Sequence, residues 1–211
     1  MYEIDIAGLN QLLNDARIAA KYAREHYGEL ASRKHTHTLY GPDTYDIGAS
    51  VPSKIVPSRA RKLLKNTRRK DYFAYELDEK YKVLRTIHVL DYATVDCTFH
   101  HFELNGVIYA YPFRGSGSEQ YNDAIYAIKY SVGKPLYYAV ARSNYLFVQF
   151  YEQLANDNMC VSTYRYSINA PKSVYGYPAD HNAPIGALNS PVQRHCTEEV
   201  PEYIDFSQWF K

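Results

Sequence analysis

The sequence predicts an α+β fold in which an antiparallel sheet of about six strands packs against two helices. Three features support this prediction: helical periodicity in the first 32 residues, a change to alternating apolar and polar residues from residue 72, and an Asn105-Gly106 dipeptide between two apolar runs. At 211 residues the chain has the length of one large domain. We therefore expect a single domain with a sizeable core.

The N-terminal segment has the pattern of an amphipathic helix. From Leu9 onward apolar side chains recur at three- and four-residue steps, which predicts a helix near residues 8–32 with Asp5 as its N-cap. The glycines and prolines of residues 33–57 follow without periodicity, so we expect a long irregular loop there. A second, short and basic helix is expected at residues 58–65.

Alternation of apolar and polar side chains predicts the strands. Asn105-Gly106 supplies the two positive-φ residues of a type I′ turn, so the strands on either side of it should form a hairpin. The parity of the apolar residues changes between Phe99 and Phe102, and a β-bulge near His100-His101 would keep both sets facing the core. The expected strands cover roughly residues 81–90, 94–104, 107–113, 136–142, 145–152 and 159–167.

A further helix is predicted near residues 119–131, between the two groups of strands. Ser116 and Glu119 have the spacing of a capping box. Apolar residues at helical spacing follow the cap. Arg114 and the glycine-rich turn that starts at Gly115 would then offer an anion site at the N-terminus of this helix, although such turns are also ordinary connections.

The composition changes after residue 167. Residues 168–211 contain five prolines, and the last residues include Trp209 and Phe210. We expect this tail to dock on the domain, because exposed aromatic side chains would form an apolar patch. The single domain 1–211 is thus expected to have three parts: residues 1–57 with the N-terminal helix and loop, residues 58–167 with the basic helix and the sheet core, and the docking tail 168–211.

Charge and cysteine content exclude several classes of protein. Lys and Arg number 24 against 23 Asp and Glu, which excludes a histone-like protein and an acidic disordered chain. The three cysteines show no CxxC spacing, so we expect no disulfide framework, metal or cofactor. The N-terminal residues lack the pattern of a signal peptide, and no apolar run is long enough to span a bilayer. We expect a cytoplasmic protein without a membrane partner.

Basic residues are concentrated in one segment, residues 54–70, which contains no acid. A cluster of this kind releases counterions when it meets phosphates and so favours binding of nucleic acid or of a phosphate-bearing ligand. The alternative is a solvated surface, or one that pairs with the acidic tail. The candidate binding residues are Lys54, Arg59, Arg61, Lys62, Lys65, Arg68, Arg69 and Lys70.

Two histidine pairs form the second candidate site. His35 and His37 lie in the expected loop, and His100 and His101 lie at the expected bulge. Together with Arg114 they could supply the acid–base groups or metal ligands of a phosphodiester hydrolase or nuclease. The alternative is that they are ordinary loop and strand histidines.

The chain is also rich in tyrosine, with 23 of 211 residues. Tyrosines on an uncovered face of the sheet would suit either the stacking of bases or a protein interface. Our leading hypothesis is therefore a non-catalytic protein that binds nucleic acid or a phosphate ligand. A protein–protein module, of the immunity type or homo-oligomeric, and a phosphodiester hydrolase are the alternatives.

Overall fold

The structure is a computed structural model and describes residues 6–41, 64–91, 93–121, 124–132, 134–142, 145–153, 159–168, 185–188 and 193–197. These residues form two helices, α1 (Ile6–Glu25) and α2 (Tyr27–Ser32), and eleven strands. Within these ranges no helix has both the length and the apolar character needed to cross a membrane.

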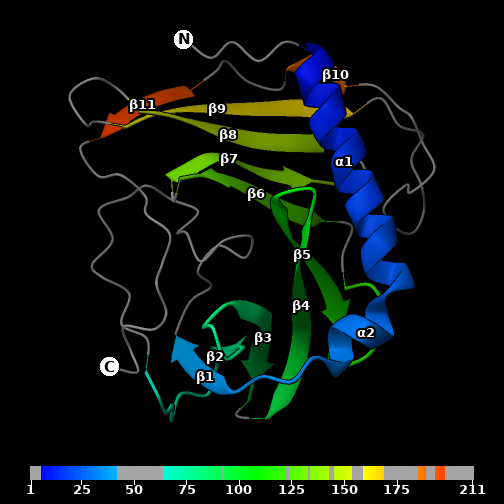
Figure 1. Ribbon diagram of the computed structural model, residues 1–211, viewed down its shortest axis with the longest axis vertical. Coiled ribbons are helices and arrows are strands. Elements are labelled where there is room, and N and C mark those ends of the chain that lie inside the picture. Colours follow the sequence, from blue (N-terminus) through cyan, green and yellow to red (C-terminus); the bar gives the residue numbers. More distant parts are fainter. Residues whose placement is uncertain are drawn as a thin grey trace.

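All eleven strands belong to one antiparallel sheet, and strands β1 to β10 follow one another across it in chain order (Figure 1). This meander arises because each strand folds back on the previous one. β10 and β11 both pair with β9, at different parts of its length. The strands are β1 (His37–Gly41), β2 (Tyr72–Leu77), β3 (Val83–Leu90), β4 (Thr94–Leu104), β5 (Val107–Arg114), β6 (Ile125–Ser131), β7 (Lys134–Ala141), β8 (Tyr145–Gln153), β9 (Met159–Ile168), β10 (Ile185–Leu188) and β11 (Gln193–Thr197).

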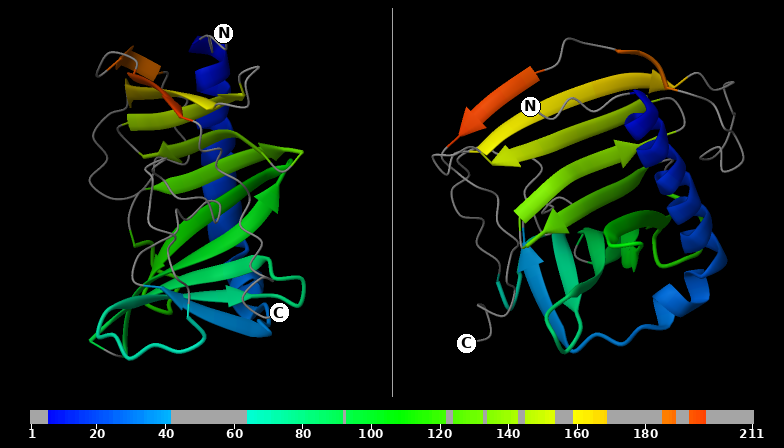
Figure 2. Two further views of the ribbon diagram at one scale, coloured as in Figure 1. Left: turned by 90° about the vertical axis from the view of Figure 1, so that its left-hand side faces the viewer. Right: turned by 45° about the horizontal axis from the view of Figure 1, so that its top comes forward.

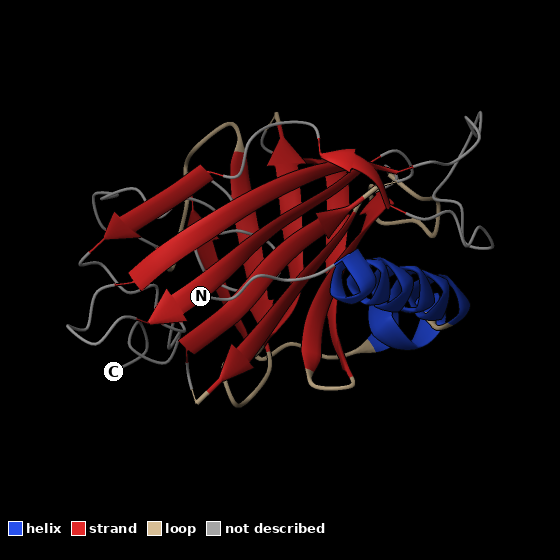
Figure 3. Ribbon diagram, turned by 90° about the horizontal axis from the view of Figure 1, so that it is seen from above, coloured by secondary structure: helices blue, strands red, loops and turns tan. Residues whose placement is uncertain are grey.

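The sheet twists strongly, so that β1, β2 and β3 run across the direction of β7, β8 and β9 (Figure 2). Both helices lie on the same side of the sheet (Figure 3). The 20 residues of α1 make a helix about 30 Å long, which spans about six strands at a spacing of ~4.8 Å. Accordingly α1 contacts β5 and β6 near the middle of the sheet and β10 beyond β9, and α2 lies against β4.

The core between α1 and the sheet combines small helical residues with aromatic strand residues. The buried stripe of α1 includes four alanines, whose short side chains allow the helix to lie close to the strands. Aromatic rings of the sheet fill the remaining space. The main contributors are Leu9, Leu13, Ala16, Ala19, Ala20 and Ala23 from α1, with Phe102, Tyr109, Tyr111, Phe113, Phe150 and Tyr164 from the strands.

The opposite face of the sheet is also apolar and buried. Ile128, Tyr138 and Tyr151 belong to one cluster there, and Cys97 and Phe99 to another. Several strands in the middle of the sheet are therefore buried on both faces, which weakens the alternation by which strands are recognised in sequence.

The two buried faces explain the change of parity in β4. Phe102 faces α1 and Phe99 faces away from it, within a strand that pairs with β5 in unbroken register from Cys97 to Leu104. The bulge expected near His100-His101 is therefore wrong. A bulge does exist in β4, at Asp96 on the β3 side.

The prediction of an antiparallel α+β fold is confirmed, but the predicted size of the sheet and the layout of the helices are wrong. Instead of a helix near residues 119–131, the chain forms β6, which pairs with β5 and β7. Ile125 packs toward α1 and Ile128 packs on the other face. Because both faces of β6 are buried, its apolar residues imitate helical spacing.

The remaining corrections concern strands that lack a clear pattern. The expected loop 33–57 contains β1, the chain before residue 81 contains β2, and the expected tail contributes β10 and β11. The predicted helix 58–65 lies largely outside the described residues. Asp5 and the end of the tail, with Trp209 and Phe210, also lie outside them.

Candidate functional site

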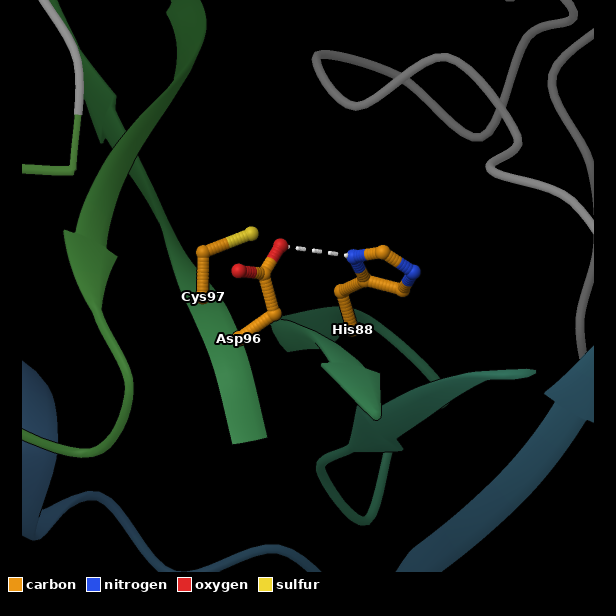
Figure 4. Close-up of side chains that lie close together, drawn as sticks. All are labelled: His88, Asp96 and Cys97. Carbon is orange, nitrogen blue, oxygen red and sulfur yellow. Dashed lines mark hydrogen bonds and ion pairs between the residues drawn. The ribbon is translucent and has the colours of Figure 1, made fainter. Parts of the chain in front are cut away.

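A β-bulge in β4 brings together three side chains that can bind metals or exchange protons. In the β3–β4 pairing His88 lies opposite Cys97 and Val89 lies opposite Val95, which leaves Asp96 as the extra residue. In a regular strand Asp96 and Cys97 would point to opposite faces, but the bulge brings both beside His88. One ligand atom from each of the three residues lies within 4.8 Å of the other two (Figure 4).

Neighbouring side chains hold this bulge cluster, which we define as His88, Asp96 and Cys97. His88 Nδ1 lies 2.9 Å from Asp96 Oδ2, and the hydroxyl of Tyr121 donates to the same carboxylate oxygen at 2.9 Å. The ring of His88 stacks on Phe73 with 4.4 Å between ring centroids. The side chains of His88 and Asp96 are 25% and 24% exposed, so solvent reaches the cluster from one side.

The electrostatics of the bulge cluster oppose activation of the Cys97 thiol as a nucleophile. Burial, and then the neighbouring Asp96 carboxylate, raise the pKa of the Cys97 thiol to about 12. The thiol is therefore protonated at neutral pH, whereas nucleophilic cysteines have a lowered pKa. The hydrogen bond to Asp96 raises the pKa of Tyr121, which keeps its phenol protonated as a donor.

His100 and His101 point to opposite faces of the sheet. His100 contacts Tyr27 and Phe113 edge-on beside α2, and His101 Nε2 lies 2.9 Å from Thr86 Oγ1 on the other face. Both rings are buried. Burial lowers the pKa of His100 to about 4 and that of His101 to about 3. Both are therefore neutral at pH 7, and their pKa values are far from those of a general base that works near neutral pH.

The partners of His35 and His37 differ from those of His100 and His101. His35 Nδ1 lies 3.4 Å from Glu76 Oε1 and 3.3 Å from Arg85 Nη2. The ring of His37 stacks on Tyr81 with 4.7 Å between centroids. Among the residues that the structure describes, the bulge cluster alone brings three potential metal ligands of His, Cys, Asp or Glu together. The four histidines of the hydrolase hypothesis do not form one metal site.

Arg114 lies at the end of β5, in a turn that leads to β6. Its backbone N–H donates to the carbonyl of Glu119 at 2.6 Å, and the N–H of Gly117 donates to the carbonyl of Arg114 at 3.0 Å. The guanidinium of Arg114 lies 3.8 Å from the Glu119 carboxylate. No helix begins here, so the turn lacks the helix N-terminus on which an anion site would depend, and it serves as a connection between β5 and β6.

The basic segment 54–70 is described from residue 64 onward. Leu64 exchanges backbone hydrogen bonds of 2.8 and 2.9 Å with Tyr40 of β1, so residue 64 lies beside the outer strand of the sheet. Lys70 Nζ lies 2.6 Å from Asp91 Oδ1. The exposed candidates are Lys65, Arg68, Arg69 and Lys70, whereas Lys54, Arg59, Arg61 and Lys62 lie outside the described residues.

Sequence reasoning missed His88, Asp96 and Tyr121. A signal for the first two was present, because the predicted strands 81–90 and 94–104 are separated by a three-residue turn that places residue 88 opposite residue 96. The bulge that adds Cys97 has no such signal, since it depends on how β4 fits against two neighbouring strands. Tyr121 reaches Asp96 from a turn 25 residues further along the chain.

Comparison with protein-family models, with curated proteins and with solved structures finds no match to this chain. Its function is therefore inferred from its own residues. Two surfaces stand out among the described residues: the exposed cations of the basic segment and the bulge cluster.

Proposed function

We propose that this protein is a non-catalytic binding protein whose basic segment, residues 54–70, contacts the phosphates of a nucleic acid or of another phosphate-bearing ligand. The observation that supports this proposal is the exposure of Arg68 and Arg69. Neither guanidinium forms an ion pair within the described part of the chain, although Lys70 next to them does. Adjacent cations without an acidic partner among the described residues favour an anionic ligand, because they repel one another until it binds.

The density of positive charge supports a phosphate ligand in particular. The segment contains eight basic residues and no acid, which is a third of the 24 basic residues of the chain. A protein that neutralises phosphates with such residues releases condensed counterions from a nucleic acid, and this release is the main source of its affinity.

Aromatic side chains lie beside the basic segment. Tyr40, which pairs with Leu64, contacts Tyr72 edge-on with 5.6 Å between ring centroids. Both tyrosines are half-buried. Tyr72 follows Lys70 by two residues. Tyrosine rings next to cations are typical of surfaces that stack bases while they bind the backbone, which supports a nucleic acid as the ligand.

The proposal is tested by titrating the full chain against labelled single-stranded and duplex oligonucleotides, and against a short polyphosphate that lacks bases. At about 50 mM salt we expect binding, and at about 200 mM salt the affinity should fall by about 10³ or more if six phosphates are contacted. Equal affinity for polyphosphate would identify phosphate alone as the ligand. Absence of binding to all three probes at low salt would overturn the proposal.

A pair of matched variants locates the binding surface. The double variant Arg68→Gln/Arg69→Gln should lower the slope of log affinity against log salt by about two. The control Lys80→Gln/Lys82→Gln removes the same charge from exposed positions in the β2–β3 turn. If the two double variants weaken binding equally, net charge and not the basic segment is responsible.

The protein–protein alternative has weaker support from the described surface. Four large hydrophobic side chains are exposed there: Ile18, Leu64, Val132 and Leu136. They lie on α1, beside β1 and on the β6–β7 hairpin, and so do not indicate one contiguous interface.

A further inference from the structure

We propose that the bulge cluster binds a single zinc ion through His88 Nδ1, a carboxylate oxygen of Asp96 and the sulfur of Cys97. This site shares no residue with the basic segment, so the proposal is independent of the proposed function. Its basis is the position of the three ligand atoms, which lie within 4.8 Å of one another on the face of the sheet away from α1.

The donor set matches the chemistry of zinc. Imidazole nitrogen, carboxylate oxygen and thiolate sulfur are its three usual protein ligands. Binding of Zn²⁺ displaces the proton of the Cys97 thiol to the solvent. The resulting thiolate and the carboxylate carry two negative charges, and the imidazole carries none. Together they neutralise a divalent cation, which matters because Cys97 is 2% exposed and a buried net charge would be costly.

Only small side-chain movements separate the present geometry from a coordinated one. With bonds of about 2.0–2.3 Å, the ligand atoms of tetrahedral zinc lie about 3.3–3.7 Å apart. His88 Nδ1 and Asp96 Oδ2, now 2.9 Å apart, would separate by less than about 1 Å, and the sulfur would approach them. Three protein ligands leave the fourth position to water, which can reach it because His88 and Asp96 are partly exposed.

The surroundings of the cluster resemble the support that metal ligands commonly receive. Tyr121 donates a hydrogen bond to Asp96, and Phe73 fixes the plane of the His88 ring by stacking. The residue opposite Cys97 in β5 is Arg114, whose side chain is 63% exposed and lies 3.8 Å from the Glu119 carboxylate. Its charge is therefore screened by solvent and by this acid.

The test uses the full chain and Co²⁺ as a spectroscopic substitute for Zn²⁺. We expect one Co²⁺ per chain, with a thiolate-to-metal charge-transfer band and the visible bands of tetrahedral cobalt, and displacement of both by Zn²⁺. Zn²⁺ should also raise the melting temperature, because it binds only the folded arrangement. A spectrum of octahedral cobalt without the charge-transfer band would overturn the proposal.

Variants assign the ligands. Asp96→Asn, His88→Gln and Cys97→Ser should each abolish the tetrahedral spectrum, whereas Tyr121→Phe should weaken Zn²⁺ binding by about 10–100-fold. The control is Cys160→Ser, which removes a thiol from β9 and should leave the spectrum unchanged. If Cys97→Ser fails to fold, the Asp96→Asn and His88→Gln variants, at partly exposed residues, still test the assignment of the ligands. An unchanged spectrum in either of them would overturn the assignment.

Discussion

At the level of single residues, an arginine holds the C-terminal end of α2 against the sheet. The guanidinium of Arg33 donates hydrogen bonds to the carbonyls of Leu30, Leu84 and His101, at 3.3, 3.2 and 2.6 Å. The last carbonyls of a helix have no partner within it, and a planar guanidinium can satisfy several acceptors at once. Arg33 thereby joins α2 to β3 and β4.

Replacement of Arg33 tests this role. Arg33→Ala should lower the free energy of unfolding by about 2–4 kcal/mol, because hydrogen bonds to a charged donor are lost and carbonyls are left without partners. Arg33→Lys should recover little of the loss, since an ammonium cannot reach the three acceptors in their fixed arrangement. Urea denaturation measures the change, with the exposed Arg68→Ala as control. A loss of less than about 0.5 kcal/mol would contradict the role.

The two buried strand histidines predict how stability depends on pH. The folded pKa values of about 4 for His100 and about 3 for His101 lie below the ordinary value of 6.5. Between these values the unfolded chain therefore binds more protons than the folded one. Their contribution to stability is complete above pH 6.5 and is lost as the pH falls toward 4, by up to about 1.4 kcal/mol per pH unit for each histidine.

Denaturant unfolding at pH 7, 6, 5 and 4.5 checks this prediction. His101→Gln removes one of the two titrating groups and should flatten the loss of stability at acid pH. If His101→Gln has the same pH dependence as the starting protein, His101 does not stay neutral in the folded state.

At the level of elements, the β4–β5 hairpin depends on its turn. Asn105 has a φ of 52° and Gly106 a φ of 71°, as a type I′ turn requires, so this sequence prediction is confirmed. A Cβ added at Gly106 would meet no atom within 4 Å, so the cost of Gly106→Ala is backbone strain alone, about 1 kcal/mol.

A glycine in α2 provides the matched comparison. A Cβ at Gly28 would also meet nothing within 4 Å, but Gly28 lies in a helix, where alanine is favoured. Gly28→Ala should therefore stabilise the protein by about 0.5–1 kcal/mol, opposite in sign to Gly106→Ala. Urea denaturation of both variants checks the pair. If both variants changed the free energy of unfolding in the same direction, backbone conformation would not be the cause of the change.

How well each element could be predicted follows from how its faces are buried. The strand predicted at residues 94–104 has the bounds of β4, because its turn residues mark its end. β6 was mistaken for a helix because Ile125 and Ile128 are buried on opposite faces. β1 was missed because an edge strand of five residues is too short to show a period.

At the level of the whole molecule, the sheet extends further than the sequence indicated, because β10 and β11 add to the free edge of β9. Their pairing is mainly a backbone interaction and requires little of the side chains. The C-terminal tail therefore contributes to the sheet before it leaves the described residues.

Docking of the last residues of the tail stays a prediction. Deletion of residues 203–211 should lower the melting temperature by at least about 5 °C, because burial of two large aromatics contributes several kcal/mol. Trp209→Ala/Phe210→Ala should reproduce most of the loss, and the neighbouring polar change Ser207→Ala/Gln208→Ala should not. A truncated monomer that melts within about 2 °C of the full chain would show that the tail lies outside the core.

The sequence by itself determined what local interactions decide: the amphipathic N-terminal helix, the tight turn at Asn105-Gly106 and most strands of the sheet. These features depend on residues that are close together in the chain, and the spacing of apolar residues or the turn residues themselves indicate them. Only the tertiary structure decided the strand identity of β6, the separation of His100 from His101 and the bulge that joins Asp96 and Cys97 to His88. Each of these features depends on which face of a strand is covered by another part of the chain. The local pattern of residues does not specify that contact.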